Sequence, residues 1–204
     1  LESTVLLALR NGLALVADAH VALDRLAASL THWRADTTWT SRAHQLAAQW
    51  NARVTELTAA TPPAGTQPYD AEVIGAVRDS TEQSDTHDIV VCAAGTLPAE
   101  LHKLWRSGVP GNYHMEYGYS CMGYEIAGGL GVKLARPERE VIVMVGDGSY
   151  LMLNSEIATS VMLGLKLIIV VLDNRGFGCI ERLQSATGGA SFNNLLEGCA
   201  LPGR

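Results

Sequence analysis

The sequence has little of what several classes of protein need. Positive charge is scarce, since 15 Lys and Arg stand against 21 Asp and Glu for a formal net charge of −6. A general nucleic-acid binder needs a basic face, so that class is disfavoured. No apolar run approaches the roughly 18 residues that would span a membrane. We therefore expect neither a nucleic-acid partner nor a membrane partner.

The few cysteines lack the spacing of a zinc site or of a disulfide framework. Cys92, Cys121, Cys179 and Cys199 are scattered, and no two of them form a C-x-x-C pair. We interpret them as reduced thiols, which are typical of cytoplasmic proteins. A basic start followed by a small-residue cleavage site is also missing, so we expect no signal peptide. These features together predict a cytoplasmic location.

What the sequence does have is apolar residues. They make up 48% of the 204 residues while charged residues make up 18%, a balance that allows a sizeable core and disfavours disorder. This length fits one full domain and part of another. Because the chain starts at Leu1 instead of a methionine and stops abruptly after Leu201-Pro202-Gly203-Arg204, we expect it to be a piece of a longer protein.

Two regions with different patterns are separated by residues 61–69, which are rich in Pro, Gly and Thr, lack periodicity and are expected to form a connector. Residues 1–60 have mostly helical spacing, with Asp18 as a candidate cap and a short strand conceivable at 13–17. A second helical pattern covers 43–57. We therefore place a domain boundary at 61–69 and expect one main domain over 70–204.

Beyond the connector, apolar strands alternate with helices. Three continuous apolar runs are expected to be strands, at 89–93, 141–145 and 167–172. Helical patterns are expected at 70–79, 97–106, 122–134 and 150–163. Buried strands that alternate with helices are typical of an α/β fold with a parallel sheet flanked by helices.

Polar clusters directly follow two of these strands. Gly146-Asp147-Gly148-Ser149 comes after the strand at 141–145, and Asp173-Asn174-Arg175-Gly176-Phe177-Gly178 comes after the strand at 167–172. Ligands of parallel α/β sheets bind at the carboxyl ends of the strands. If these two strands are neighbours, Asp147 and Asn174 face each other across a small gap.

Such a gap suits a magnesium ion bound to a phosphate group. Mg²⁺ prefers six oxygen ligands and is usually held by one or two carboxylates and by phosphates. Asp147 offers a carboxylate and Asn174 an amide oxygen, while Gly146 and Gly148 allow close approach of a phosphate to the backbone. The amide of Ser149 opens a helix whose positive end favours an anion. The alternative is a pair of ordinary strand-to-helix turns.

A Rossmann-type nucleotide site fits the sequence poorly. It requires G-x-G-x-x-G directly after an early strand, with an acidic residue about 20 positions further on. The candidate Gly129-Leu130-Gly131 lies inside a predicted helix and precedes the strand at 141–145.

The spacing of Gly146-Asp147-Gly148, then 25 residues, then Asn174 resembles the thiamine-diphosphate motif of the acetolactate-synthase-like enzymes. This resemblance implies the thiamine-diphosphate-binding fold, thiamine diphosphate and Mg²⁺ as cofactors, and Asp147, Asn174 and the carbonyl of Gly176 as metal ligands. Many members have asparagine where this chain has Asp173, which is not an expected ligand.

The same resemblance implies a set of residues that contact the cofactor. By this resemblance, Met122 would support the bent form of the cofactor, and the carbonyl of Ser120 would accept a hydrogen bond from the cofactor's amine. The alternative for Met122 is a packing role at the start of a helix. The full set is Gly95, Thr96, Ser120, Met122, Gly146, Gly148, Ser149, Gly176 and Phe177.

The amino-acid sequences of segments 111–123, 146–156 and 181–194 resemble one group within this family more specifically. Its members hydrolyse a ring carbon–carbon bond of a trihydroxycyclohexane-1,2-dione in myo-inositol breakdown, and the product is 5-deoxy-glucuronate. The small-molecule substrate would thus be a cyclic diketone. Two alternative functions remain open. The chain could belong to another thiamine-diphosphate lyase or carboligase, or it could be a non-catalytic cofactor-binding module.

The resemblance also sets limits on what this chain does alone. Residues 1–60 would be the end of the family's central domain, and residues 70–204 would be its pyrophosphate- and magnesium-binding domain, incomplete at the C-terminus. The parent would be a homodimer or homotetramer that shares its sites between subunits. The activating glutamate of the family belongs to an amino-terminal domain, so we assign that role to no residue here and expect the chain alone to be inactive. Candidates for the substrate pocket are His114, Glu116 and Gln184, with purely structural roles as the alternative.

Overall fold

The computed structural model describes residues 15–82 and 88–196, and the chain divides into two units, residues 1–50 and 51–204. In the first unit, α2 (Ala19–Ser29) starts after Asp18, whose Oδ1 accepts from the amide of Val21 at 3.1 Å. This confirms Asp18 as the cap. Helix α3 (Thr37–Ala59) continues into the second unit. The division falls inside α3, and the connector expected at 61–69 stays a prediction.

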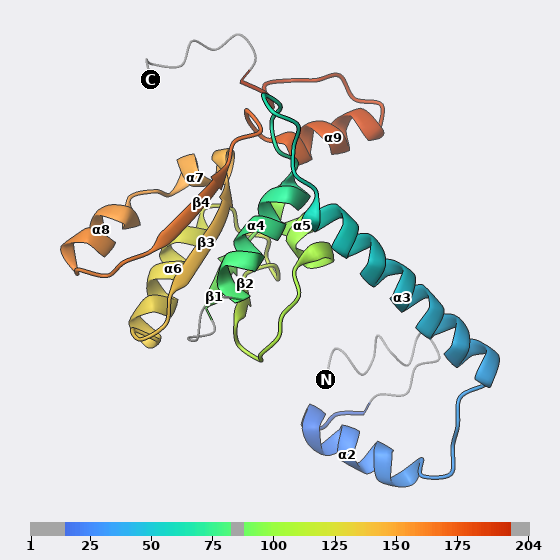
Figure 1. Cartoon of the computed structure of the whole chain (residues 1–204). Helices are drawn as coiled ribbons and strands as arrows, with labels where there is room; N and C mark the ends of the chain where they lie inside the picture. Colours follow the sequence, from blue (N-terminus) through green and yellow to red (C-terminus); the bar gives the residue numbers. More distant parts are fainter. Residues whose placement is uncertain (1–14, 83–87, 197–204) are drawn as a thin grey trace. The chain divides into compact units, whose positions relative to one another are not determined.

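The second unit contains a parallel sheet of four strands (Figure 1). These are β1 (Ile89–Cys92), β2 (Tyr113–Met115), β3 (Val141–Gly146) and β4 (Ile168–Leu172), in the order β2-β1-β3-β4. The central strands β1 and β3 are almost completely buried, which is why they consist of unbroken apolar residues. The predicted α/β fold is confirmed.

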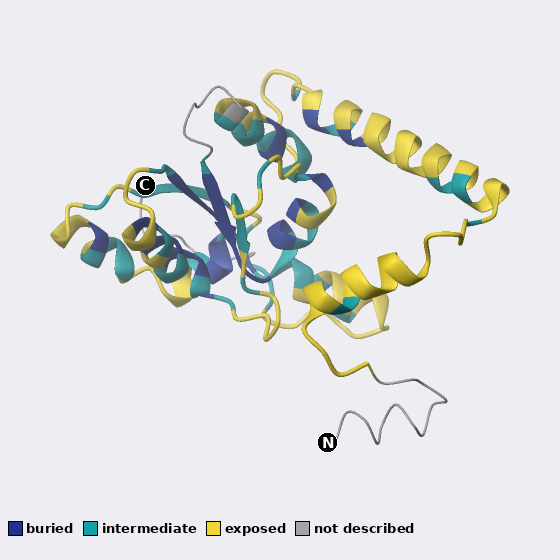
Figure 2. Cartoon of the chain, turned by 90° about the horizontal axis from the view of Figure 1, so that it is seen from below, coloured by how far each residue is buried: buried dark blue, intermediate teal, exposed yellow. Residues whose placement is uncertain are grey.

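Helices cover both faces of the sheet, and successive residues of each strand pack against opposite layers. Val90 and Met144 face one core cluster, with α4 (Asp70–Glu82) and α5 (Thr96–Leu104). Val143 faces the other cluster, with α6 (Tyr124–Ala135). Figure 2 shows the buried residues concentrated in the sheet and on the helix faces turned toward it. The chain continues through α7 (Asp147–Met152), α8 (Glu156–Met162) and α9 (Gly178–Ala186).

Some elements differ from the sequence-based expectation. The helix expected over 150–163 is two helices, α7 and α8, which are interrupted at 153–155. Asn154 and Ser155 lie in this interruption, and such side chains compete with helical backbone hydrogen bonds. The helix expected from Met122 starts at Tyr124, because Gly123 has a left-handed φ of +91°. Of the strand considered at 13–17, residues 13 and 14 lie outside the described residues and 15–17 form no strand.

Candidate functional site

The pairing of β3 with β4 brings the two polar turns together. Gly146 is the register partner of Leu172, so the chain leaves both strands at the same edge of the sheet. Asp147 then opens α7, and Asn174 follows β4 in the loop that leads to α9. The neighbouring strands that the sequence argument required are therefore present.

Three oxygen-bearing groups converge between these turns. The amide oxygen of Asn174 lies 3.3 Å from Oδ1 of Asp147 and 2.8 Å from the carbonyl oxygen of Gly176. All three atoms are hydrogen-bond acceptors, so no hydrogen bond joins them in this arrangement. Rotating the amide by 180° would let its nitrogen donate to both oxygens. A cation between the three oxygens would satisfy them equally well.

The donor set fits magnesium. Ligand oxygens about 2.0–2.1 Å from an octahedral Mg²⁺ lie about 2.9 Å from one another, close to the separations between these groups. A carboxylate, an amide oxygen and a backbone carbonyl are all hard ligands of the kind that Mg²⁺ takes. They leave half of an octahedral shell for phosphate oxygens and water. The residues present thus fit a diphosphate-bound magnesium ion.

The Asp147 carboxylate is held in place from two sides. Its Oδ2 accepts from the amide of Gly176 at 2.7 Å, which leaves Oδ1 to face Asn174. The side chain is buried, and this burial raises the pKa of Asp147, while the amides of Gly176 and Gly148 lower it and the neighbouring Asp173 raises it further. A bound cation would favour the ionised form.

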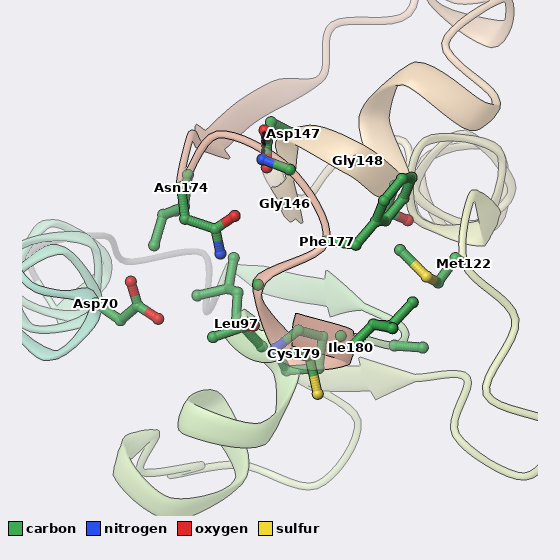
Figure 3. A pocket seen from close by; sticks show the side chains of 18 of the residues that line it. Asp70, Leu97, Met122, Gly146, Asp147, Gly148, Asn174, Phe177, Cys179 and Ile180 are labelled. Atoms are coloured by element: carbon green, nitrogen blue, oxygen red, sulfur yellow. Dashed lines mark hydrogen bonds between the residues drawn. The ribbon is translucent and has the colours of Figure 1, made fainter. Parts of the chain in front are cut away.

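All residues predicted to contact the cofactor or the metal line one pocket with a volume of about 180 Å³. Figure 3 shows Asp147 and Asn174 on the two loops at one edge of it, with Asp70 and Met122 on opposite sides. The lining shared with the prediction is Gly95, Thr96, Ser120, Met122, Gly146, Asp147, Gly148, Ser149, Asn174, Gly176 and Phe177.

Leu97 and Gly178, which stand beside predicted residues in the sequence, also line the pocket. Sequence reasoning missed the other residues of its lining, namely Asp70, Ala94, Pro98, Leu172, Cys179 and Ile180. Asp70 is the polar one among them. Burial raises the pKa of its carboxyl, nearby Glu100 raises it further, and Arg182 opposes both. Asp70 opens α4, which is far from the two turns in sequence, so no local pattern linked it to them.

A returning segment holds the loop that carries Gly176. The amide of Phe177 donates to the carbonyl of Asn194 at 2.7 Å, and the amide of Leu196 donates to the carbonyl of Arg175 at 2.7 Å. The side chain of Asn194 donates to Oε2 of Glu181 at 2.9 Å. The distinctive 181–194 segment therefore has a structural role, which is to hold in place the loop of residues 173–177. We call this loop the metal loop, because it carries the predicted metal ligands Asn174 and Gly176.

Two residues that are not glycine have left-handed backbone conformations beside the pocket. Ser120 has φ +58° and Arg175 has φ +66°, conformations that cost free energy in any residue with a Cβ. Ser120 lines the pocket, and Arg175 lies between Asn174 and Gly176. Strain of this kind is concentrated at functional sites.

The three substrate-pocket candidates lie outside this pocket. Nε2 of His114 is 2.7 Å from the hydroxyl of Tyr124, and their rings stack. Glu116 accepts from the amides of Tyr119 and Cys121, which lower the pKa of its carboxyl. Their role toward a substrate stays a prediction.

The third candidate, Gln184, packs within the segment that follows the metal loop. Its side chain donates to the carbonyl of Ala190 and accepts from Asn194. Nearby on α9, Arg182 donates to the hydroxyl of Thr96 at 3.0 Å. Arg182 thereby connects α9, the helix that follows the metal loop, to the start of α5, which borders the pocket.

Two other features are absent from residues 15–82 and 88–196, a cluster of metal-binding side chains and a membrane-spanning helix. Within that range, no three side chains of His, Cys, Asp or Glu lie close enough together to hold a metal ion. This agrees with the predicted magnesium site, in which Asp147 is the only carboxylate ligand. Within the same range, no helix combines the length and the apolar character that crossing a membrane requires.

Comparison with known families supports the interpretation of the pocket. Residues 93–197 match the family described as thiamine pyrophosphate enzyme, C-terminal TPP binding domain. That range includes β2, β3, β4 and both polar turns. Among solved structures, a thiamine diphosphate-dependent 4-hydroxybenzoylformate decarboxylase from Rhodococcus jostii has a similar fold, with a TM-score of 0.59 and 19% identity over 67% of this chain and 25% of its own.

Curated relatives are similar in sequence over somewhat more than half of the chain. A protein named 3D-(3,5/4)-trihydroxycyclohexane-1,2-dione hydrolase from Bacillus licheniformis is 53% identical over 111 residues, which is 54% of this chain and 17% of that protein. Its namesake from Shouchella clausii is 48% identical over 128 residues, or 63% of this chain and 20% of its own. The chain spans about a fifth of the length of these relatives.

Proposed function

Since the chain belongs to the family of thiamine pyrophosphate enzymes, as their C-terminal TPP-binding domain, we propose that it binds the diphosphate of this cofactor through Mg²⁺ held by Asp147, Asn174 and the carbonyl of Gly176. The observation that carries this proposal is the convergence of three oxygens at 2.8 and 3.3 Å. Thiamine diphosphate, when bound, supplies the electron sink for breaking a carbon–carbon bond next to a carbonyl.

The other lining residues have simpler tasks in this proposal. Gly148 leaves room beside the Phe177 ring, because a Cβ at 148 would lie 2.7 Å from its Cε1. Gly95 has φ +118° and an open space where a Cβ would stand, so the backbone before α5 can approach a phosphate. Met122 and Ser120 are proposed to contact the pyrimidine side of the cofactor.

We expect binding of thiamine diphosphate to require magnesium. Without the cation, the Asp147 carboxylate would face the diphosphate charge directly, and two like charges about 4 Å apart repel by on the order of 4 kcal/mol in a partly buried site. Titration calorimetry with Mg²⁺ and with excess EDTA should therefore differ by ~100-fold or more in affinity. Equal affinity under both conditions would remove Asp147 and Asn174 from the metal site.

For the reaction, we propose hydrolysis of a ring carbon–carbon bond of a cyclic trihydroxy-1,2-dione by the complete enzyme, in cytoplasmic breakdown of inositol. Identities of 53% and 48% to hydrolases of that name support this proposal. A homodimer or homotetramer with sites shared between subunits, and an activating glutamate from another domain, belong to the same proposal.

We expect the full-length enzyme to open 3D-(3,5/4)-trihydroxycyclohexane-1,2-dione and to leave pyruvate and benzoylformate essentially unchanged. Because a site built to hydrogen-bond substrate hydroxyls rejects analogues that lack them by ~10⁴-fold, the two classes should separate clearly in a coupled assay. Preferential decarboxylation of a 2-oxo acid would instead support a lyase or decarboxylase. The result does not depend on the assignment of the metal ligands, because ring opening and decarboxylation would use the same metal site.

A further inference from the structure

Two carboxylates hold the backbone on either side of Met122. Before it, Oε1 of Glu116 accepts from the amide of Tyr119 at 3.0 Å and Oε2 accepts from Cys121 at 2.7 Å. After it, Oε2 of Glu125 accepts from the amide of Gly123 at 3.1 Å. The residue proposed to support the cofactor thus sits in a segment whose amides are fixed by side chains.

Glu125 also joins this segment to the diphosphate turn. The hydroxyl of Ser149 lies 2.8 and 2.7 Å from the two carboxylate oxygens of Glu125, and it accepts from the amide of Gly123 at 2.7 Å. Ser149 lies in α7, directly after the metal ligand Asp147 and Gly148. One buried triangle of hydrogen bonds therefore connects the residue after Met122 with the turn that follows β3.

The buried position of the Glu125 carboxylate is energetically unfavourable, because the charged group is removed from water. Glu125 is 1% exposed and Ser149 is 2% exposed, and burial raises the pKa of Glu125 while its hydrogen bonds to Ser149 and Gly123 lower it. A buried carboxylate costs several kcal/mol of desolvation, and a well-packed apolar side chain in its place is often neutral or stabilising. Packing of α6 alone thus gives no reason for a glutamate at 125.

We propose that Glu125 is a positioning residue, which orients the Ser149 hydroxyl and the Gly123 amide so that the Met122 segment keeps a fixed distance from the diphosphate turn. The proposal rests on the proposed function, because thiamine diphosphate would contact both segments at once. A ligand that consists of the diphosphate alone would contact only one of them. Substitution of Glu125 should therefore weaken the binding of thiamine diphosphate more than the binding of the diphosphate alone.

The first test needs no ligand. A Glu125→Leu substitution keeps a side chain of similar size but removes one of the two acceptors of the Gly123 amide and the carboxylate that orients the other, the Ser149 hydroxyl. We therefore expect hydrogen exchange of the Gly123 amide to become roughly 10- to 100-fold faster, as for a lost hydrogen bond to a charged group. Glu125→Gln keeps one side-chain oxygen as an acceptor in this position, and it should restore exchange at Gly123 to within about threefold of the original rate. Unchanged exchange at Gly123 in Glu125→Leu would overturn the proposal.

The second test compares two ligands in the presence of Mg²⁺. In Glu125→Leu, we expect calorimetric affinity for thiamine diphosphate to fall roughly 10- to 100-fold, while affinity for inorganic pyrophosphate stays within about threefold. The urea midpoint should be unchanged or higher, because an apolar side chain replaces a buried charge. Equal losses for both ligands, or a Glu125→Gln variant as impaired as Glu125→Leu, would contradict a positioning role.

Two further variants complete the design. Glu138→Leu makes the same chemical change at an exposed carboxylate after α6 and should leave both affinities and the exchange rates unaltered. If Glu125→Leu fails to fold, Ser149→Ala removes the shared hydroxyl and should make exchange of the Gly123 amide about 3- to 10-fold faster, a readout that does not depend on contact between Ser149 and the cofactor. If the unsubstituted chain binds neither thiamine diphosphate nor pyrophosphate, the proposed cofactor site is wrong. The positioning role of Glu125 is decided separately, by the hydrogen exchange rate of the Gly123 amide.

Discussion

An Asp147→Asn substitution should abolish most of the magnesium-dependent binding of thiamine diphosphate. Oδ2 of Asp147 accepts from the amide of Gly176 at 2.7 Å, so an asparagine can keep that bond only by turning its NH₂ group toward Asn174 and the cation. The site would lose its charge and one ligand oxygen together. Removing one partner of a buried charge interaction costs about 3–5 kcal/mol, which corresponds to an affinity loss of ~100-fold or more.

The matched control for this change is Asp173→Asn. It makes the same substitution in the neighbouring loop, where the carboxylate accepts from the amide of Arg175 at 2.9 Å and is not among the proposed ligands. Because Asp173 is close enough to raise the pKa of Asp147, calorimetric titration of thiamine diphosphate with Mg²⁺ should show some loss of affinity, but at most about 10-fold and smaller than that of Asp147→Asn. If Asp173→Asn were the more damaging variant, the carboxylate ligand would be Asp173 and our assignment would be wrong.

A Gly176→Ala substitution should damage both the metal loop and the fold around it. Gly176 has φ +136°, and an added Cβ would lie 2.3 Å from the carbonyl oxygen of Asn194. The collision is with backbone, so a side-chain rotation cannot relieve it. Overpacking costs about 1–3 kcal/mol, and the left-handed conformation adds about 1–2 kcal/mol.

We therefore expect Gly176→Ala to unfold at a lower temperature in calorimetry and to bind thiamine diphosphate with Mg²⁺ at least ~10-fold more weakly. Gly188→Ala is the control, because Gly188 also has a positive φ, +81°, but no atom within 4 Å of an added Cβ. It should show only the conformational cost of about 1–2 kcal/mol and no loss of affinity. A Gly176→Ala chain that binds as tightly as Gly188→Ala would exclude the Gly176 carbonyl as a ligand.

Much of the fold followed from local patterns. The apolar run at 141–145 is long enough to predict β3 on its own, and these residues are buried in the centre of the sheet. The two polar turns follow their strands directly, so sequence order alone put Asp147 and Asn174 at one edge of a parallel sheet. By contrast, β2 (Tyr113–Met115) has three partly exposed residues, which are too few to produce a periodic signal.

What the sequence by itself determined is the type of each main element, the cofactor family and the residues at the ends of the strands, because these depend on neighbouring positions. The tertiary structure alone decided which distant groups meet. Asp70 reaches the pocket from α4, Asn194 returns to hold the Gly176 loop, and Glu125 on α6 meets Ser149 on α7. Such contacts depend on how packed helices and strands are placed in space, and hydrophobic periodicity along one element carries no information about the polar partner that another element supplies.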